Sequence, residues 1–518
     1  MDHLLQEAHQ SFQNGNIFRA HECYLKAIQA NSNDACLHVN IGSCYIEMKQ
    51  WKKAFEHFQI ALECDPRNPG AHTNLSHAYR LVGRMSDAVH HIQKVVEIEP
   101  DSCVAQSNSL LYLNYCPEIS SNELFEYHVN WGQQFHYEPK NKLHFSNFPD
   151  PDRPLRIGII SPDFRGHSVG YFIEPLLVHY NRKVMEVFCY AHVPNPDQTT
   201  KTVQKKVNQY IQIHKMNDRE LAKRIRFDGI DILVDLAGHT ANSRVRAMIF
   251  NPAPIQMTYL GYPTTTGLKH IDYRITDAIV DPEGDSDSLH TEKLIRLEPH
   301  FFCFPPLGNS IPVSQLPALK KKHITFGGFH NTSKISDSVI RLWADVLRQI
   351  PDSDIIFQAA AYDDPDVVRY FQSCFEHYGI HSNRMKYIGK VPFDHYLKLH
   401  NTIDIMLDTF PWTGHTTSCH ALWMGIPILT LDGNRHSSRI GKCLMNALGL
   451  SEWVARDQQA FIKNAHDFSQ QIESIDKIRK GLRKRILKST ISHKQKYVQS
   501  LENTFRNVWE KWCEEQRQ

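Results

Sequence analysis

The sequence predicts an α-helical superhelix followed by α/β structure, with two Rossmann-like, doubly wound domains and a cleft between them. Three observations predict this fold class. Similar side chains recur every 34 residues through residues 1–102. Short apolar runs begin near Leu155 and alternate with helical patterns. A proline-rich stretch from Pro299 to Lys322 divides these runs into two groups, so we expect one parallel sheet from each group.

Composition excludes several classes of function. The chain carries 58 Lys and Arg against 56 Asp and Glu, a net charge of +2, so no chain-wide positive field attracts nucleic acid or an acidic membrane. No window approaches the roughly 18 apolar residues of a membrane span, and the first residues lack the pattern of a signal peptide. Twelve scattered cysteines without a CxxC pair suit reduced thiols. We therefore expect a cytoplasmic protein without nucleic-acid or membrane partners.

The first fifth of the chain, residues 1–102, consists of repeats. Three sets of residues agree at the 34-residue offset, namely small residues, aromatic or aliphatic residues, and residues that close each unit: Ala20, Ala54 and Ala88; Tyr24, Phe58 and Ile92; Ser32, Pro66 and Pro100. Small residues allow two helices to cross closely, and a proline after the second helix ends it. These are tetratricopeptide positions, so we expect three full repeats over 1–102 and the first helix of a fourth over 102–116.

A row of asparagines follows the same period. Asn40, Asn74 and Asn108 are 34 residues apart and should line the inner face of the superhelix. A side-chain amide both donates and accepts, so such a ladder can hydrogen-bond the backbone of an extended peptide. The alternative is that these amides only cap or bridge helices. We expect a weak peptide-binding surface from so short an array.

The rest of the chain divides into further segments. Asn122–His136 has helical spacing, and the polar stretch from Glu138 to Pro154 is typical of a linker. The predicted domains are the repeats over 1–118, a linker helix and connector over 119–153, an N-terminal Rossmann-like half over 154–300, a connection over 301–322, and a C-terminal half with terminal helices over 323–518.

The sequence of the α/β part predicts where a ligand binds. The apolar runs expected to form strands are 156–161, 186–192, 231–238, 323–329, 354–360, 403–410 and 427–431. Ligands of such folds bind at the carboxyl ends of the strands. His167 and His239 follow two of these strands, Lys334 follows a third, and Gly-His-Thr-Thr (414–417) opens a helix. A helix N-terminus with hydroxyls, together with a lysine, predicts a ligand that carries phosphate, bound in the second half.

Long motifs give the chain a family resemblance. They are DFRGHSVGYF, LAGHTANSRV, PAPIQMTYLGYPTTTGLKHIDYRITD, FGGFHNTSKIS and LDTFPWTGHTTSCHALWMGIP. With the repeats, they resemble the O-linked N-acetylglucosaminyltransferase and SPINDLY group of protein O-glycosyltransferases over essentially the whole chain. The resemblance implies an inverting transferase of GT-B architecture, a nucleotide-sugar donor, Ser/Thr hydroxyls of proteins as acceptors, and no metal or other cofactor.

The resemblance also implies roles for individual residues. Lys334 matches the lysine that neutralises the leaving diphosphate. His167 and His239 match histidines near the sugar and the acceptor. The positions that match donor-binding residues are Asn331, His415, Thr416 and Thr417. Gly261, Tyr262 and Pro263 match the loop that forms the wall of the sugar pocket.

Two positions depart from the family pattern. His420 stands where the family has an acidic residue that holds the ribose, and Tyr396 stands where a histidine stacks on the base. Both stay in our predicted donor site, but they leave the nucleotide open. We favour UDP-GlcNAc as donor, with GDP-fucose or an inactive repeat scaffold as alternatives.

The chemistry leaves the general base open. The acceptor hydroxyl can lose its proton to His167, His239, Asp235 or a donor phosphate oxygen, and the residue types do not choose among them. The acidic runs Asp285–Asp287 and Asp363–Asp366 imitate a metal-binding motif. We expect them to cap helices or turns instead, because neither follows a strand end in the cleft.

Overall fold

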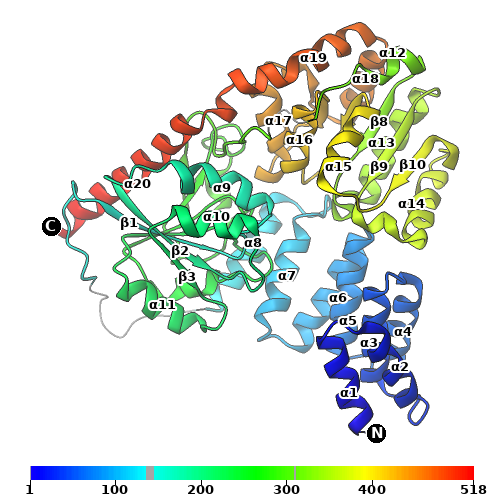
Figure 1. Cartoon of the computed structure of the whole chain (residues 1–518), viewed down its shortest axis with the longest axis horizontal. Helices are drawn as coiled ribbons and strands as arrows, with labels where there is room; N and C mark the ends of the chain where they lie inside the picture. The colour runs from blue at the N-terminus through cyan, green and yellow to red at the C-terminus, as the bar shows by residue number, and fades with distance from the viewer. Residues whose placement is uncertain (1, 136–144, 308–310, 518) are drawn as a thin grey trace. The chain divides into compact units, whose positions relative to one another are not determined.

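The computed structural model describes residues 2–135, 145–307 and 311–517 (Figure 1). The chain divides into two compact units of three segments each: Met1–Glu118, Ser314–Trp412 and Asp457–Asp476 form unit 1, and Ile119–Val313, Thr413–Arg456 and Lys477–Gln518 form unit 2. The domain boundaries drawn from the sequence stay predictions. The expected end of the linker helix at His136, part of the linker and residues 308–310 of the predicted connection lie outside the described residues.

Unit 1 opens with the predicted helical repeats. Consecutive helices pack as antiparallel pairs (Figure 1): α1 (Asp2–Gln13), α2 (Ile17–Ile28), α3 (Ala35–Glu47), α4 (Trp51–Cys64), α5 (Pro69–Leu81), α6 (Met85–Ile98) and α7 (Cys103–Leu113). Ala20, Ala54 and Ala88 are fully buried where helices cross. A Cβ at Gly42 would lie 2.4 Å from the Phe58 ring, which explains the small residue there. The helical repeat region is thus confirmed.

The remainder of unit 1 is a parallel α/β layer structure. Its strand order is β10-β9-β8-β11, and Trp343 is buried against the sheet. The strands are β8 (Thr325–Gly328), β9 (Asp354–Gln358), β10 (Met385–Ile388) and β11 (Ile405–Leu407). The helices are α12 (Pro317–Lys321), α13 (Asp337–Gln349), α14 (Pro365–His377), α15 (Phe393–Leu399) and α18 (Gln458–Ser469), and α19 (Ile472–Lys488) begins in this unit.

Unit 2 contains a larger parallel sheet with the order β3-β2-β1-β4-β5-β6-β7. Helices α9 and α10 cover one face and α11 the other, as the right-handed crossover rule requires (Figure 1). The strands are β1 (Leu155–Ser161), β2 (Met185–Ala191), β3 (Gln209–Gln212), β4 (Ile232–Asp235), β5 (Ile255–Thr258), β6 (Tyr273–Thr276) and β7 (Lys293–Arg296). Strands β12 (Ile428–Leu431) and β13 (Val454–Ala455) pair with each other and are the last two in the order of the six-stranded sheet. The helices are α8 (Ser121–Gln133), α9 (Ser168–His179), α10 (Gln198–Lys206), α11 (Asp218–Phe227), α16 (Thr416–Trp423), α17 (His436–Ala447) and α20 (Lys494–Arg517).

The two parallel-sheet α/β domains confirm the predicted fold class, but several strands were absent from the sequence prediction. Strands β3, β6, β7 and β10 are four residues long and carry polar or charged residues. Strand β5 lies in a stretch that we expected to be a close-passing loop, and its four residues are all buried. Runs this short give no periodic signal, so only pairing with a neighbouring strand defines them.

Among the described residues, no helix is long and apolar enough to cross a membrane.

Candidate functional site

Lys334 lies at the end of a short 3-10 turn (Thr332–Lys334) that follows strand β8. Its ammonium is 5.1 Å from the centre of the Trp412 ring, within the range of a cation–π interaction. Burial lowers the pKa of Lys334 to about 8, against the opposing effect of the Asp408 carboxylate. A weakly hydrated ammonium at a strand end is well suited to interact with an anion.

The surroundings of this lysine are anchored to neighbouring strands. Asn331 caps the turn by accepting a hydrogen bond from the Ser333 amide at 3.0 Å, and its side chain is exposed. The His330 Nε2 lies 2.8 Å from the Leu407 carbonyl oxygen, and burial lowers the pKa of His330 to about 4. Asp408 is buried and accepts from the Thr409 amide at 2.9 Å. Strands β8 and β11 therefore hold the lysine's turn from both sides.

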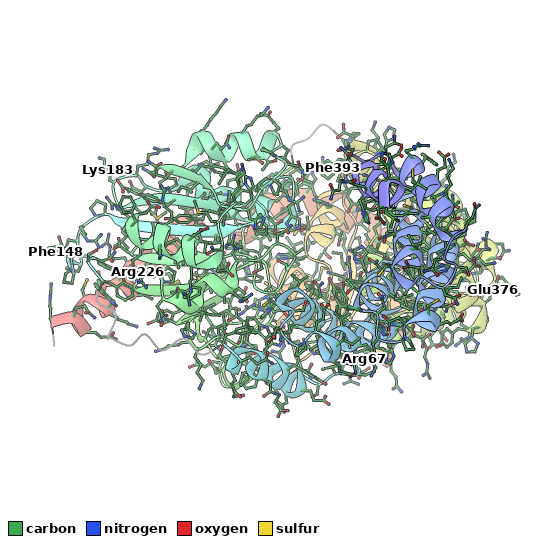
Figure 2. All side chains as sticks on the ribbon, turned by 90° about the horizontal axis from the view of Figure 1, so that it is seen from below. Arg67, Phe148, Lys183, Arg226, Glu376 and Phe393 are labelled. Carbon is green, nitrogen blue, oxygen red and sulfur yellow. The ribbon has the colours of Figure 1, made fainter. Side chains whose placement is uncertain are left out.

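Tyr396 belongs to a small group of aromatic rings at the same edge of this sheet. Its ring is 4.9 Å from His400, 6.0 Å from Phe393 in a stacked arrangement, and 6.4 Å from Phe329, which directly follows β8. Phe393 is 46% exposed and lies at the surface of helix α15 (Figure 2). Tyr396 is partly exposed, so one side of this group is open to a planar ligand.

The predicted phosphate turn in unit 2 opens helix α16. His415 is the N-cap, and its ring stacks on Phe172 at 4.0 Å and meets the edge of Phe302 at 4.6 Å. Thr416 and Thr417 occupy the first turn and are partly exposed, where backbone N–H groups have no partner within the helix. The Thr413 hydroxyl donates to the Ser437 carbonyl at 2.8 Å and fixes the approach to the turn. This geometry is that of an anion-binding helix end.

His420 lies deeper in the same helix. It is only 6% exposed, and its ring is 6.4 Å from Phe304. No carboxylate stands at this position, as the sequence already showed. A direct contact between His420 and the donor stays a prediction.

His167 caps helix α9, one turn before Phe172. Its Nδ1 lies 3.3 Å from the Val169 amide nitrogen and 3.3 Å from a carboxylate oxygen of Asp163, so it either accepts from the amide or, when it carries the proton, donates to the carboxylate. Burial lowers the pKa of His167, and Asp163 opposes that shift. The side chain is 41% exposed, so a neutral imidazole with an orienting carboxylate is accessible. Asp163 stands in the motif itself, but its contact with His167 was not predicted.

His239, by contrast, is completely buried. Its Nε2 is 2.9 Å from the Thr266 carbonyl oxygen, its ring meets Trp131 of α8 at 4.4 Å, and burial lowers its pKa to about 4. Such surroundings favour a positioning role for His239, and the predicted catalytic role stays untested. Asp235 is likewise buried, and burial raises its pKa to about 6 against two backbone amides that donate to it.

The Gly261-Tyr262-Pro263 loop packs tightly beside His239. A Cβ at Gly261 would lie 1.8 Å from the Leu236 carbonyl oxygen, so only glycine fits. The Tyr262 hydroxyl is 2.7 Å from His128 Nε2, and Arg274 donates to the Tyr262 carbonyl at 2.8 Å. Helix α8 therefore holds the wall of the predicted sugar pocket, a function that its sequence did not reveal.

Three ion pairs link charged side chains within unit 2. His436 lies 2.8 Å from Asp281, and although burial opposes ionisation, the histidine holds the pKa of Asp281 well below its usual range. Arg439 pairs with Asp285 at 2.5 Å and donates to the Gly433 carbonyl. Asp287 pairs with Arg296 at 2.9 Å. The acidic run 285–287 is thus engaged with arginines.

The run 363–366 is engaged in the same manner. Asp363 pairs with Lys49 at 2.6 Å, and Asp364 caps helix α14 by accepting from the Asp366 amide at 2.7 Å. Asp366 itself pairs with Arg369.

A group that could hold a metal ion is Asp277, His300 and Cys443, buried in unit 2 with candidate ligand atoms within 4.8 Å of one another. The Cys443 sulfur is 3.4 Å from His300 Nδ1 and 3.7 Å from Asp277. Burial raises the pKa of the thiol well above its usual value, which favours the protonated form over a metal-binding thiolate. Hydrogen bonding explains these contacts.

Two of the three predicted peptide-binding asparagines line a cavity in the repeats. Asn40 and Asn74 belong to the lining of a cavity of about 360 Å³, with Ser43, His77 and Phe12 among the others. The Asn74 amide donates to the Ser43 hydroxyl at 3.2 Å. Asn108 on α7 lies outside that lining in the described structure.

The structure gathers the predicted residues into two groups. Unit 1, which also contains the repeats, carries Lys334, Asn331 and Tyr396. Unit 2 carries His167, His239, the 261–263 loop and the 415–420 turn. Tetratricopeptide helices joined to two parallel-sheet α/β domains, with a lysine and an anion-binding turn after strands, define the class of GT-B-type glycosyltransferases.

Comparison with known proteins assigns the family. The chain matches the family model described as glycosyl transferase family 41 over residues 133–305 and 309–501, and a tetratricopeptide repeat model over 69–102. The chain belongs to glycosyl transferase family 41.

Individual relatives agree with this assignment. The probable UDP-N-acetylglucosamine–peptide N-acetylglucosaminyltransferase SPINDLY of Arabidopsis thaliana is 36% identical over 418 residues, which are 80% of this chain and 46% of that protein. The similarly named SEC protein of the same plant is 26% identical over 377 residues. The chain thus spans about half the length of its SPINDLY relatives. A mutant O-GlcNAc transferase of Thermobaculum terrenum superposes with a TM-score of 0.89 at 29% identity, covering 99% of this chain and 98% of that one.

Proposed function

We propose that the chain transfers a single N-acetylglucosamine from UDP-GlcNAc to Ser and Thr hydroxyls of proteins, with inversion and without a metal ion or other cofactor. The observation that carries this proposal is Lys334. Its ammonium lies at a strand end beside Trp412, partly desolvated, where it can neutralise the diphosphate that leaves. A desolvated cation gains more from developing negative charge than a hydrated one does.

The chain's other residues supply the remaining functions of the reaction. The N-terminus of α16, with Thr416 and Thr417, offers backbone and hydroxyl donors for phosphate oxygens. Tyr396 offers a ring face to the base. His167, neutral and oriented by Asp163, is the accessible candidate for accepting the proton of the acceptor hydroxyl.

Acceptor proteins would be held by the repeats and the cleft. The cavity lined by Asn40 and Asn74 has the amide groups that an extended peptide backbone needs, and it supports this part of the proposal. Cytoplasmic action is proposed together with it, because intracellular proteins would then be the acceptors.

The second candidate donor is GDP-fucose. It stays an alternative because the segments GHTAN and TTTGLKHIDYRITD resemble the SPINDLY members, for which the family resemblance implies fucosyl transfer. A thermal-shift comparison of UDP with GDP separates the two donors, because the nucleotide that the native state binds raises Tm. Purified chain is then incubated with each radiolabelled donor and cell extract. Labelled protein from UDP-GlcNAc supports the proposal, and absence of label from both donors supports the inactive scaffold instead.

A further inference from the structure

The turn that carries Lys334 is hydrogen-bonded to a helix of the repeats. The Thr332 hydroxyl donates to the Leu81 carbonyl at 2.5 Å, and the Ser333 hydroxyl donates to the Arg80 carbonyl at 3.0 Å. Both hydroxyl side chains are buried. Residues 80 and 81 are the last two of helix α5, and the Arg80 carbonyl also accepts from the Gly83 amide at 3.3 Å. The two hydroxyls therefore attach the Lys334 turn to the carboxyl end of α5.

The backbones also approach closely at this point. Gly83, just past the helix end, has a φ of +82°, and a Cβ there would lie 2.9 Å from the Thr332 carbonyl oxygen. A larger residue would push the Lys334 turn away from the repeats. The contact is therefore specific to this backbone geometry.

The lysine side chain meets the repeats by a second route. The Trp412 ring, which lies 5.1 Å from the ammonium, stacks on Tyr115 at 4.6 Å with an angle of 25° between the ring planes. Tyr115 follows helix α7 of the repeats. Helix α5 thus contacts the lysine's backbone turn, and Tyr115 contacts the ring on which its ammonium rests.

We propose that the repeat region is a positioning element of the donor site: helix α5, through Thr332 and Ser333, and Tyr115, through Trp412, hold Lys334 in its working position. This rests on the proposed function, which gives Lys334 its task. Thr332, Ser333 and Tyr115 are positioning residues.

A consequence for regulation follows from the other contacts of α5. The same helix contributes Asn74 and His77 to the cavity of the repeats. A peptide bound in that cavity would therefore contact the same helix that holds the Lys334 turn. Any coupling between the two sites would be reciprocal.

The test uses a matched pair of variants in the full-length chain. Thr332→Val removes the hydroxyl and keeps the shape, whereas Thr332→Ser keeps the hydroxyl. Ser373→Ala, on the exposed face of α14, is the control for loss of a hydroxyl remote from this contact. Misplacement of a catalytic group by about 1 Å costs on the order of 100-fold in rate. We expect kcat to fall roughly 10- to 100-fold in Thr332→Val with the donor KM little changed, and to be largely kept in Thr332→Ser and Ser373→Ala.

A kcat of Thr332→Val within twofold of the unmodified chain would overturn the proposal, as would an equal loss in Thr332→Ser. Tyr115→Ala gives a second readout. It removes the support of Trp412, so we expect kcat to fall as well. If Tyr115→Ala had the same kcat as the unmodified chain, the contact of Tyr115 with Trp412 would have no positioning role, and only α5 would position Lys334.

A substrate-free measurement separates this proposal from the proposed function. Lysines are labelled by 13C reductive methylation, and the Lys334 signal is assigned by its absence in Lys334→Ala. The charged or titratable groups facing this ammonium are Asp408, His330 and, across Tyr115, Arg80. We expect Thr332→Val to move the titration midpoint of Lys334 upward as the turn loosens and water enters. An unmoved midpoint contradicts the proposal even if the chain is an active transferase, and a moved one supports it even if no transfer is found.

Discussion

Lys334 is the residue on which the proposed chemistry depends most. It is an amine beside an indole ring, and burial lowers its pKa to about 8. Such an ammonium is costly to keep charged and is therefore strongly stabilised by an arriving diphosphate. No other residue of the predicted set combines a full positive charge with this degree of desolvation in the described part of the chain.

Removing this charge should abolish transfer. We expect Lys334→Ala to lower kcat by roughly 100-fold or more, since loss of one donor to developing charge costs about that much. Because the side chain carries a desolvation penalty, the fold should not be weakened, and Tm should stay within a few degrees. Steady-state kinetics with a thermal scan checks both. Near-normal turnover of this variant would show that the site is assigned wrongly.

The pKa of Lys334 gives a pH dependence with a definite sign. The folded-state pKa, about 8, lies below the ordinary 10.5, so the positive charge is present at neutral pH and is lost as the pH rises through 8. The affinity for UDP should be constant below that point and fall about tenfold for each further pH unit. Isothermal titration calorimetry at a series of pH values measures it. A flat profile up to about pH 9 would contradict a role for the Lys334 charge in diphosphate binding.

At the scale of elements, helix α8 has a function that its position in a linker hides. It buries His128 and Trp131 against the 261–263 loop and His239. Burial lowers the pKa of His128 to about 3, so the imidazole is neutral and bonds to Tyr262 at 2.7 Å. The helix therefore fixes the loop that we expect to wall the sugar.

The hydrogen bond between His128 of α8 and Tyr262 of the 261–263 loop can be tested by removing the Tyr262 hydroxyl. Tyr262→Phe leaves the buried His128 without this partner, and such losses cost about 1–3 kcal/mol. We expect a Tm lower by several degrees and a raised donor KM, because the loop loses its support. Differential scanning fluorimetry and kinetics measure the two effects. An unchanged Tm would mean that the loop is held by other contacts, such as that of Arg274.

Much of this element level could be predicted from the sequence. The 34-residue period, the apolar runs and the turn at 414–417 all lie within short stretches of chain, where local patterns report local structure. The bonds of Thr332 to Leu81, His128 to Tyr262 and His436 to Asp281 join residues far apart in sequence. A single sequence carries no signal for such pairs, nor for the burial of His239, whose predicted catalytic role stays a prediction.

At the scale of the whole molecule, the repeats and the α/β layers around Lys334 form one compact unit. Lys49 with Asp363, and the Trp51 amide with Asp364, add contacts between the repeats and the α/β layers. Acidic residues that resemble a metal motif in the sequence thus join two parts of this unit. The repeats therefore belong to the same compact unit as Lys334.

The repeat cavity should affect protein acceptors most. We expect Asn40→Ala with Asn74→Ala to raise the KM for a protein acceptor roughly 30-fold, because two amide hydrogen bonds worth about 1 kcal/mol each are lost. The donor KM should stay the same. Asn108→Ala is the matched comparison, since Asn108 lies outside the described lining of the cavity. An equal effect of Asn108→Ala would favour a ladder along the whole array over a local cavity.

The most direct measurement is mass spectrometry of proteins co-expressed with this chain and, in parallel, with its Lys334→Ala variant. Our account predicts Ser and Thr residues that carry the added mass of an N-acetylhexosamine with the unmodified chain and none with the variant. The added mass of a deoxyhexose would contradict the proposed donor. Modification that persists in the Lys334→Ala variant, or no modification with either chain, would contradict the central claim.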